Sequence, residues 1–278
     1  MTDEELKSLQ FKILEIVRYF DTFCKENNIT YYLMGGSALG AMRHKGFIPW
    51  DDDFDVFMDY ENYMKFLAVA KEKLDTDLFY LQEENSEEYP LYFSKIRMNG
   101  TTFIEKDIKD KVMHHGIYID IMCLNNTSEN ISMRYLQYIS ARILNTRALV
   151  VHGYSTNSPI KKIALTMSKY LINGFIKRGL LKIVRSLNTS NTKYVGHFFG
   201  RAPFKKTSFL KTYLGMPRYV PFDDFILPVP HEVEKYLTVR YGKKYMEMPS
   251  EVVKAQYPSH AYIVDTKKSY VFYQDKEL

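Results

Sequence analysis

The chain has 278 residues, of which 46% are hydrophobic and 26% charged, so it can bury a core without disulfides or a structural metal. Its 13 glycines and 10 prolines exclude collagen-like and low-complexity classes, and its two cysteines, Cys24 and Cys123, exclude a zinc ribbon or a disulfide scaffold and favour a reducing compartment. The net charge of +5 hides an asymmetry, because residues 131–222 contain 16 Lys and Arg but no Asp or Glu. The polar start and the lack of a long apolar run lead us to expect neither a signal peptide nor a membrane-spanning helix, and hence a cytoplasmic protein.

The first half of the chain predicts alternating helices and strands. Thr2 and Glu5 form a capping-box pattern, and apolar residues at helical spacing extend that helix to about Glu26. Further helices are expected over residues 37–44 and 60–73. Strands are expected over residues 29–34, 53–58, 78–82, 92–98, 101–104 and 116–123, with Asn99-Gly100 as a hairpin signal.

The second half predicts mainly helices separated by prolines. We therefore expect an α+β fold in which residues 1–125 form a mixed β-sheet with flanking helices and residues 126–278 form a mostly helical region that completes the site. One further helix is expected over residues 231–241.

Residues 161–186 predict an amphipathic helix inside the acid-free segment, with interruptions at Gly174 and Gly179. One face of the helix carries Ile160, Ile163, Ala164, Met167, Tyr170, Leu171 and Phe175, and the other carries Lys162, Thr166, Lys169, Asn173 and Lys177. Such a helix either packs its apolar stripe on the core or lies in the plane of a membrane interface. The missing acids favour an anionic partner, for which nucleic acid, a phosphorylated glycan and a lipid surface are the alternatives.

A run of acids leads into the second predicted strand: Asp51-Asp52-Asp53-Phe54-Asp55. Side chains alternate along a strand, so Asp53 and Asp55 would project from one face about 6–7 Å apart. Asp120 is a third acid, alone among apolar residues on a predicted buried strand, where an unpaired charge is costly. Oxygen ligands without His or Cys suit a hard ion, Mg²⁺ or Mn²⁺.

Gly35-Gly36-Ser37 stands between the first predicted strand and a short helix, where backbone N–H groups can bind phosphate. Each of these features also has a purely structural interpretation. The glycines could form a turn, the acids could lie in a solvated loop or begin a helix, and Asp120 could be a structural acid with a hydrogen-bonded partner. Their order along the chain is the nucleotidyltransferase-type arrangement, and it favours phosphoryl or phosphodiester transfer at a metal.

The contiguous run from Tyr32 to Val56, YLMGGSALGAMRHKGFIPWDDDFDV, resembles the signature of the LicD family. These are phosphorylcholine transferases of bacterial surface glycans that are related to fukutin and fukutin-related protein. Residues 116–123, 226–230 and 241–246 are similar to later features of the family. The resemblance implies a nucleotidyltransferase-type fold and a Mg²⁺-dependent transfer of a phospho-alcohol from a CDP-activated donor to a hydroxyl of a cell-surface glycan, such as a lipopolysaccharide or teichoic acid precursor.

The resemblance also implies roles for individual residues. Asp53 and Asp55 would hold the metal, and Asp120 would complete the site as a ligand or a general base. The expected donor-binding residues are Gly35, Gly36, Ser37, Arg43, His44, Lys45, Lys95 and Arg97. For Lys95 and Arg97 a solvated strand face is an equal alternative, and Trp50 is expected to pack beneath the acids.

The implied partners are CDP-choline or another CDP-alcohol, a lipid-linked glycan acceptor and an anionic membrane surface at which the protein would be peripheral, with no nucleic acid expected. If choline is the alcohol, tyrosines would cage its quaternary ammonium. Two rivals stay open: a nucleotidyltransferase that uses an NTP, and a non-catalytic protein that binds nucleic acid through the basic segment.

Overall fold

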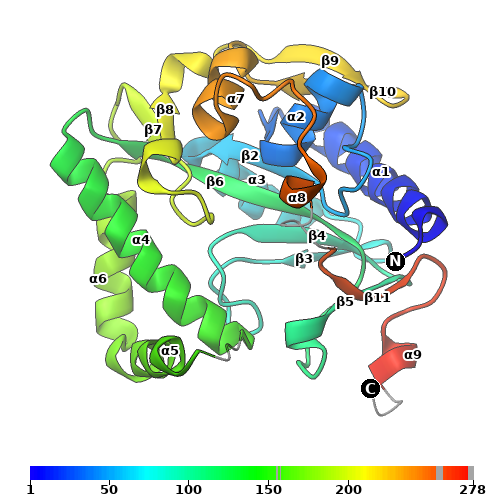
Figure 1. Ribbon diagram of the computed structural model, residues 1–278, viewed down its shortest axis with the longest axis horizontal. Coiled ribbons are helices and arrows are strands. Elements are labelled where there is room, and N and C mark those ends of the chain that lie inside the picture. The colour runs from blue at the N-terminus through cyan, green and yellow to red at the C-terminus, as the bar shows by residue number, and fades with distance from the viewer. Residues whose placement is uncertain (155, 157, 255–258, 275–278) are drawn as a thin grey trace.

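A mixed β-sheet forms the centre of the molecule, with helices around it (Figure 1). The computed structural model describes residues 1–154, 156, 158–254 and 259–274. The helices are α1 (Asp3–Glu26), α2 (Gly35–His44), α3 (Tyr60–Lys73), α4 (Ile131–His152), α5 (Pro159–Leu171), α6 (Gly174–Arg185), α7 (Val233–Tyr241), α8 (Glu251–Lys254) and α9 (Val271–Gln274). The strands are β1 (Tyr32–Leu33), β2 (Asp55–Asp59), β3 (Phe79–Gln82), β4 (Ser94–Met98), β5 (Thr102–Glu105), β6 (Tyr118–Thr127), β7 (Tyr194–Gly196), β8 (Ser208–Leu210), β9 (Arg218–Phe222), β10 (Phe225–Val229) and β11 (Ala261–Asp265). Single 3-10 turns lie at η1 (Lys106–Ile108), η2 (Phe204–Lys206) and η3 (Lys211–Tyr213).

The sheet is ordered β1-β2-β6-β4-β3, and β7 continues from the end of β6 to β8. Strands β2 and β6 are parallel, whereas β1, β4 and β3 join the sheet antiparallel to their neighbours. All ten residues of β6 are buried, as expected of a strand covered on both faces. Because β2 and β6 run in parallel, their amino-terminal ends lie at the same edge of the sheet, and this edge carries the acids described below.

Local side-chain interactions fix the start of the first helix, α1. The Thr2 side chain accepts the Glu5 N–H at 3.2 Å, and the Glu5 carboxylate accepts the Thr2 N–H at 2.7 Å, which confirms the predicted capping box. Leu9, Ile13 and Phe20 are fully buried on the face of α1 that packs against β4 and β6. Asp59 caps the start of helix α3, because its side chain accepts the Asn62 N–H, and α3 packs against β2 and β6.

The C-terminal half is helical only in part, which corrects the prediction of a mostly helical region. Helices α4, α5 and α6 begin this half, but strands β7 to β11 follow them. Strands β9 and β10 form a hairpin beside β1, and β11 pairs with β5 from the first half. These strands are short and interrupted by prolines and glycines, so their alternation is weak in the sequence.

The turn at Asn99-Gly100 does not close the hairpin that the sequence indicated. Gly100 has a positive φ of 70°, as such a turn requires, but β4 pairs with β3 and β6 while β5 pairs with β11. Asn99-Gly100 thus predicts the turn correctly, but not which strands pair, because that depends on distant segments.

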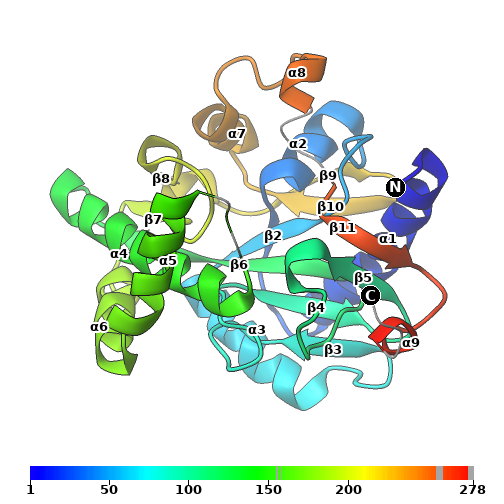
Figure 2. The same cartoon turned by 60° about the horizontal axis from the view of Figure 1, so that its bottom comes forward.

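Helices α4, α5 and α6 lie together at one end of the molecule in both views (Figures 1 and 2). Helices α4 and α6 share a second apolar core with the segment after β3, and Tyr89, Leu144 and Val184 are among its residues. The predicted long helix breaks once, between α5 and α6, with Asn173 capping α6, and it continues through Gly179. The side chains at positions 160 and 164 lie outside the described residues. No helix within the described ranges is both long and apolar enough to cross a membrane.

We expect His114 to make stability depend on pH. Its Nδ1 accepts the Gly116 N–H at 3.0 Å, and its Nε2 lies 2.9 Å from Asn99 Oδ1, an arrangement that suits the neutral ring. Burial and the charge of Arg97 lower the pKa of His114 to about 4. A depressed folded-state pKa contributes stability that is present above the unfolded value near 6.5 and is lost as the pH falls towards 4.

The stability advantage of the wild type over His114→Gln should therefore shrink between pH 6.5 and 4, by up to about 1 kcal/mol per pH unit. Urea unfolding of both proteins at a series of pH values measures it. A constant difference would show that His114 does not titrate in this way.

Candidate functional site

A cleft of about 510 Å³ lies between α2, the acidic loop that precedes β2, and the chain from α7 to β11. Aromatic, acidic and basic side chains share its wall. The residues that line it are Gly36, Leu39, Arg43, Ile48, Trp50, Asp51, Asp52, Asp53, Asp55, Lys206, Tyr241, Lys244, Tyr245, Glu247, Met248, Pro249, Lys254 and His260.

The parallel pairing of β2 with β6 sets the position of two predicted acids. Asp55 stands directly opposite Asp120 in the register, and the Asp120 N–H donates to the Phe54 carbonyl at 2.9 Å. The Asp55 N–H in turn donates to Ser37 Oγ at 2.8 Å, which fixes the start of β2 against α2. Asp53 lies just before β2 rather than on it, which corrects the predicted start of that strand.

The two glycines at the start of α2 allow the backbone to lie against these acids. A Cβ on Gly36 would stand 2.6 Å from Asp51 Oδ2, and one on Gly35 would stand 3.4 Å from Asp55 Oδ2. Gly35 also has a positive φ of 52°, and its N–H donates to the Tyr236 hydroxyl at 3.0 Å. Of the predicted phosphate-binding residues 35–37, Gly36 lines the cleft, whereas the hydroxyl of the buried Ser37 holds Asp55 in place.

The acids at this edge disfavour one another's charge. Burial and the charges of Asp53 and Asp120 raise the pKa of Asp55 well above its ordinary range. Burial and the charges of Asp53 and Asp52 do the same to the pKa of Asp51. Burial, opposed by His260 and reinforced by Asp120, raises the pKa of Asp53 to about 6. A bound cation would relieve this repulsion.

Asp120 has a fixed counter-ion behind the cleft. Lys95 Nζ lies 2.6 Å from Asp120 Oδ1, and the two residues face each other across β4 and β6. Burial lowers the pKa of Lys95, while Asp120 acts in the opposite sense. The ammonium also lies 3.2 Å from the centroid of the Tyr118 ring. Neither Lys95 nor Asp120 lines the cleft, so the pair supports Asp55 from behind.

The structure does not bring Arg97 to the cleft. Its side chain is fully buried, and its guanidinium donates to Gln82 Oε1 and to the Gly116 carbonyl, both at 2.8 Å. Lys95 and Arg97, two residues apart on β4, therefore share a face of the strand that is buried. The solvated strand face, which was the alternative reading, is contradicted.

The three basic residues at the end of α2 have different surroundings. Arg43 lines the cleft and donates to the carbonyls of Tyr245 and Glu247, both at 3.2 Å. His44 Nε2 accepts the Arg43 Nε–H at 2.9 Å, and its pKa is lowered by burial and by that charge. Lys45 is exposed with a positive φ of 58°, where it ends the helix, and is not among the lining residues.

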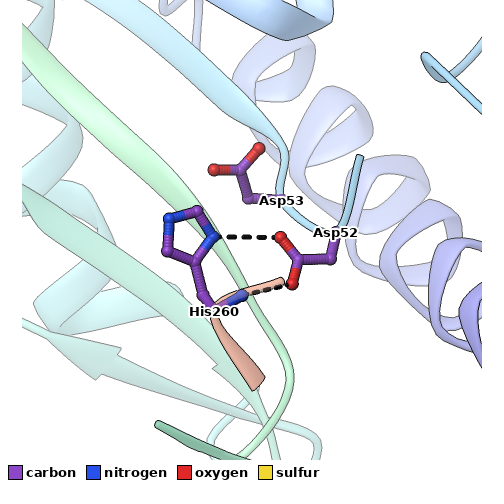
Figure 3. Close-up of side chains that lie close together, drawn as sticks. All are labelled: Asp52, Asp53 and His260. Carbon is purple, nitrogen blue, oxygen red and sulfur yellow. Dashed lines mark hydrogen bonds and ion pairs between the residues drawn. The ribbon is translucent and has the colours of Figure 1, made fainter. Parts of the chain in front are cut away.

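A histidine that no sequence motif indicates joins the acids. Asp52 is buried; its Oδ1 lies 3.0 Å from His260 Nδ1, and its Oδ2 accepts the His260 N–H at 2.7 Å and the Ser259 hydroxyl at 2.6 Å (Figure 3). Burial raises the pKa of Asp52, but these hydrogen bonds outweigh it and the pKa is lowered. The hydrogen bond to Asp52 raises the pKa of His260 to about 9 against the effect of burial, so the imidazolium form predominates at neutral pH.

In the part of the chain that the structure describes, one group of side chains has its ligand atoms close enough together to hold a cation. Ligand atoms of Asp52, Asp53 and His260 lie within 4.8 Å of one another, but both Asp52 oxygens already bind His260 or Ser259. Asp51, Asp53 and Asp55 also line the cleft, form no ion pair with another described residue, and offer oxygen atoms alone as donors. Their mutual effect on pKa fits a hard divalent ion such as Mg²⁺ or Mn²⁺.

The remaining wall of the cleft offers cations and aromatic rings from the C-terminal half. Lys206 and Lys244 line it beside Tyr241 and Tyr245. The ammonium of Lys254 lies 4.5 Å from the centroid of the Trp50 ring. Trp50 therefore presents a ring face to the cleft, rather than only packing beneath the acids. The sequence signal for these residues is weak, because lysines and tyrosines are frequent throughout the chain.

Comparison with known proteins agrees with the sequence resemblance. Residues 28–122 match the family model described as LicD/FKTN/FKRP, nucleotidyltransferase domain. The chain is 48% identical over 64 residues to the lipopolysaccharide cholinephosphotransferase LicD of Haemophilus influenzae, which is 23% of this chain and 24% of that protein. The chain thus spans about a quarter of the length of this relative.

Other matches are shorter or weaker. An uncharacterized protein of Rickettsia typhi is 46% identical over 44 residues, which covers 16% of this chain and 14% of that protein. Mannosyltransferase regulator 4 of Saccharomyces cerevisiae is 29% identical over 141 residues, which covers 48% of this chain and 11% of that protein. The resemblance to the LicD family is confirmed over the segment that contains Gly36, the acid run and Asp120.

The acids should differ in their effect on stability without metal. Asp55→Asn removes a buried charge whose pKa is raised, so at neutral pH it should raise the free energy of unfolding by about 1 kcal/mol or more. Asp120→Asn leaves Lys95 buried without its counter-ion and should lower the free energy of unfolding by about 3 kcal/mol.

Urea unfolding in the presence of EDTA measures both changes. The exposed Asp110→Asn serves as the matched control, with an expected change within about 0.5 kcal/mol. Destabilisation by Asp55→Asn as large as that by Asp120→Asn would contradict the account of repelling carboxylates.

Proposed function

Because residues 28–122 carry the LicD resemblance, we propose that this protein is a Mg²⁺-dependent phosphotransferase. It would move a phospho-alcohol, phosphocholine before others, from a CDP-activated donor to a hydroxyl of a cell-surface glycan, in a lipopolysaccharide or teichoic acid precursor. The observation that carries the proposal is the group of mutually repelling carboxylates in a cleft that also contains Gly36 and several cations.

Asp51, Asp53 and Asp55 would hold the metal, which would neutralise phosphate charge and orient the donor when bound. Asp120 keeps the predicted place beside Asp55, but its ion pair with Lys95 favours a supporting role over that of a direct ligand or base. Ser37 likewise positions Asp55 through its hydrogen bond.

The donor's diphosphate needs positive charge that does not depend on the metal. Arg43, Lys206 and Lys244 line the cleft from three different segments, and His260 adds an imidazolium held by Asp52. In the transfer, the acceptor oxygen forms a bond to the phosphorus that bears the alcohol, and the bond from that phosphorus to CMP breaks. The acceptor proton passes to a carboxylate of the cluster, and the cations stabilise the charge that develops on CMP.

The aromatic wall favours a cationic alcohol. An ammonium, that of Lys254, already lies over the Trp50 ring, and Tyr241 and Tyr245 line the same cleft. A quaternary ammonium over an indole face gains about 1–2 kcal/mol where it is partly desolvated. Glycerol and ribitol carry no charge and would gain nothing from this ring.

A nucleotidyltransferase that uses an NTP is the second candidate, because the matched family model is described by that domain name. It would use the same acids but release pyrophosphate. The released product separates the two reactions: CMP from a CDP-alcohol, or pyrophosphate from an NTP.

Thermal unfolding with Mg²⁺ and a series of nucleotides tests the donor. We expect CDP-choline at about 100 times its Kd to add roughly 2.7 kcal/mol of stability, and Asp55→Asn to abolish the shift. CDP-glycerol, CDP-ribitol, CDP-ethanolamine, ATP and CTP are the comparison ligands. A shift with ATP or CTP alone would overturn the phosphotransferase proposal in favour of the second candidate.

The Trp50 ring should discriminate between donors. Trp50→Leu is expected to weaken CDP-choline binding by about tenfold and to leave CDP-glycerol binding unchanged, while Trp50→Phe retains most of the affinity. Isothermal titration with each donor measures this. Equal losses for both donors would mean that Trp50 shapes the cleft without contacting the alcohol.

A further inference from the structure

Helices α5 and α6 leave an apolar surface uncovered. Ile163, Met167, Tyr170, Leu171 and Phe175, here called the apolar patch, recur at helical spacing, and all five are exposed. Ile163 is 61% exposed, Tyr170 74% and Phe175 79%. The apolar stripe of the predicted amphipathic helix therefore does not face the core, which was the simpler of its two interpretations. Clusters of exposed apolar side chains of this kind mark interaction sites.

The opposite side of α5 is already used for packing within the protein. Helix α5 packs against α4, and Ile172 at its end is buried. Both views show α4, α5 and α6 at the same end of the molecule, far from α1 and α9 (Figures 1 and 2). Four residues of the apolar patch thus lie on α5 and Phe175 lies at the start of α6, and both helices pack against α4.

Basic side chains lie on the same two helices as the apolar patch. Four side chains of α5 and α6 are exposed and basic: Lys162, Lys169, Arg178 and Lys182. None of the four forms an ion pair with a described residue, and the Lys169 ammonium lies 5.9 Å from the centroid of the exposed Tyr170 ring. By contrast, Arg185 turns inward and pairs with the buried Glu84, so it adds no charge to this surface.

We propose that the apolar patch and the four exposed basic residues of α5 and α6 dock the protein on an anionic lipid surface, with α5 in the plane of the interface. Aliphatic and aromatic side chains beside lysines match the two layers of such an interface, the acyl boundary and the negative headgroups. A second copy of the chain is a poorer occupant, because a symmetric contact would bring the same cations together. Nucleic acid would pair with the cations but leave Ile163, Met167 and Leu171 without a matching apolar surface.

This inference does not rest on the proposed transferase activity, because vesicle binding is measured without donor, acceptor or metal. The probes are vesicles of phosphatidylcholine alone and vesicles of phosphatidylcholine mixed equally with phosphatidylglycerol. We expect the full chain to co-sediment with the mixed vesicles at low salt, and binding to fall as salt rises.

Two variants test the assigned residues. Tyr170→Ser with Phe175→Ser should weaken binding to the mixed vesicles by about tenfold or more. Lys162→Gln with Lys169→Gln should weaken it by about fivefold for each lysine replaced. The matched control is Phe11→Ser with Ile226→Ser, which replaces exposed apolar residues on α1 and β10 and should bind like the wild type. Circular dichroism confirms that each variant is folded.

A second readout does not depend on loss of binding. Phe175→Trp in a Trp50→Phe background places the single indole in the apolar patch, and its emission should shift to the blue with mixed vesicles only. Equal binding to both vesicle types, equal binding by the two patch variants and the control, or an unshifted emission would each overturn the proposal. Dimerisation without vesicles that Tyr170→Ser with Phe175→Ser abolishes would assign the surface to a second copy instead.

Discussion

Negative charge concentrated at one end of the parallel β2–β6 pair is the constraint on which the rest of the structure depends. The register places Asp55 beside Asp120, and the acidic loop adds Asp51 and Asp53. Charges this close cannot all persist without compensation. The protein provides it in part: Lys95 neutralises Asp120 from behind, and His260 neutralises Asp52. Asp51, Asp53 and Asp55, which form no ion pair with another described residue, line the cleft, and a cation bound there would relieve their repulsion.

The two halves of the chain contribute different parts of this site. The first half provides the acids and the glycines against which they lie, and this is the half that matches known LicD proteins. The second half provides Lys206, Tyr241, His260 and the rest of one half of the cleft wall. The acids and part of the surface around them thus come from different segments. Substitutions in the second half can therefore alter which ligand fits the cleft while the acids stay the same.

The structure also explains why some predicted site residues separate. Arg43, His44 and Lys45 are consecutive, but a helix that ends at His44 sends their side chains in different directions, and Arg43 alone of the three lines the cleft. Lys95 and Arg97 share a strand face as predicted, yet that face is buried, so one residue becomes a counter-ion and the other a donor to Gln82 and Gly116. Spacing along a helix or strand gives the direction of a side chain relative to its neighbours, and burial decides what it meets.

Local patterns in the sequence determined the capping box of α1, the helix α3, most strands of the first half, the break between α5 and α6, and the acid run with its two glycines. These features depend on residues within a few positions of one another, so the chain itself specifies them. The tertiary structure alone decided that β5 pairs with β11 instead of β4, that His260 joins Asp52, that Lys95 neutralises Asp120, and that the apolar side of α5 stays uncovered. Each of these depends on which distant segments pack together, and no local spacing encodes that choice.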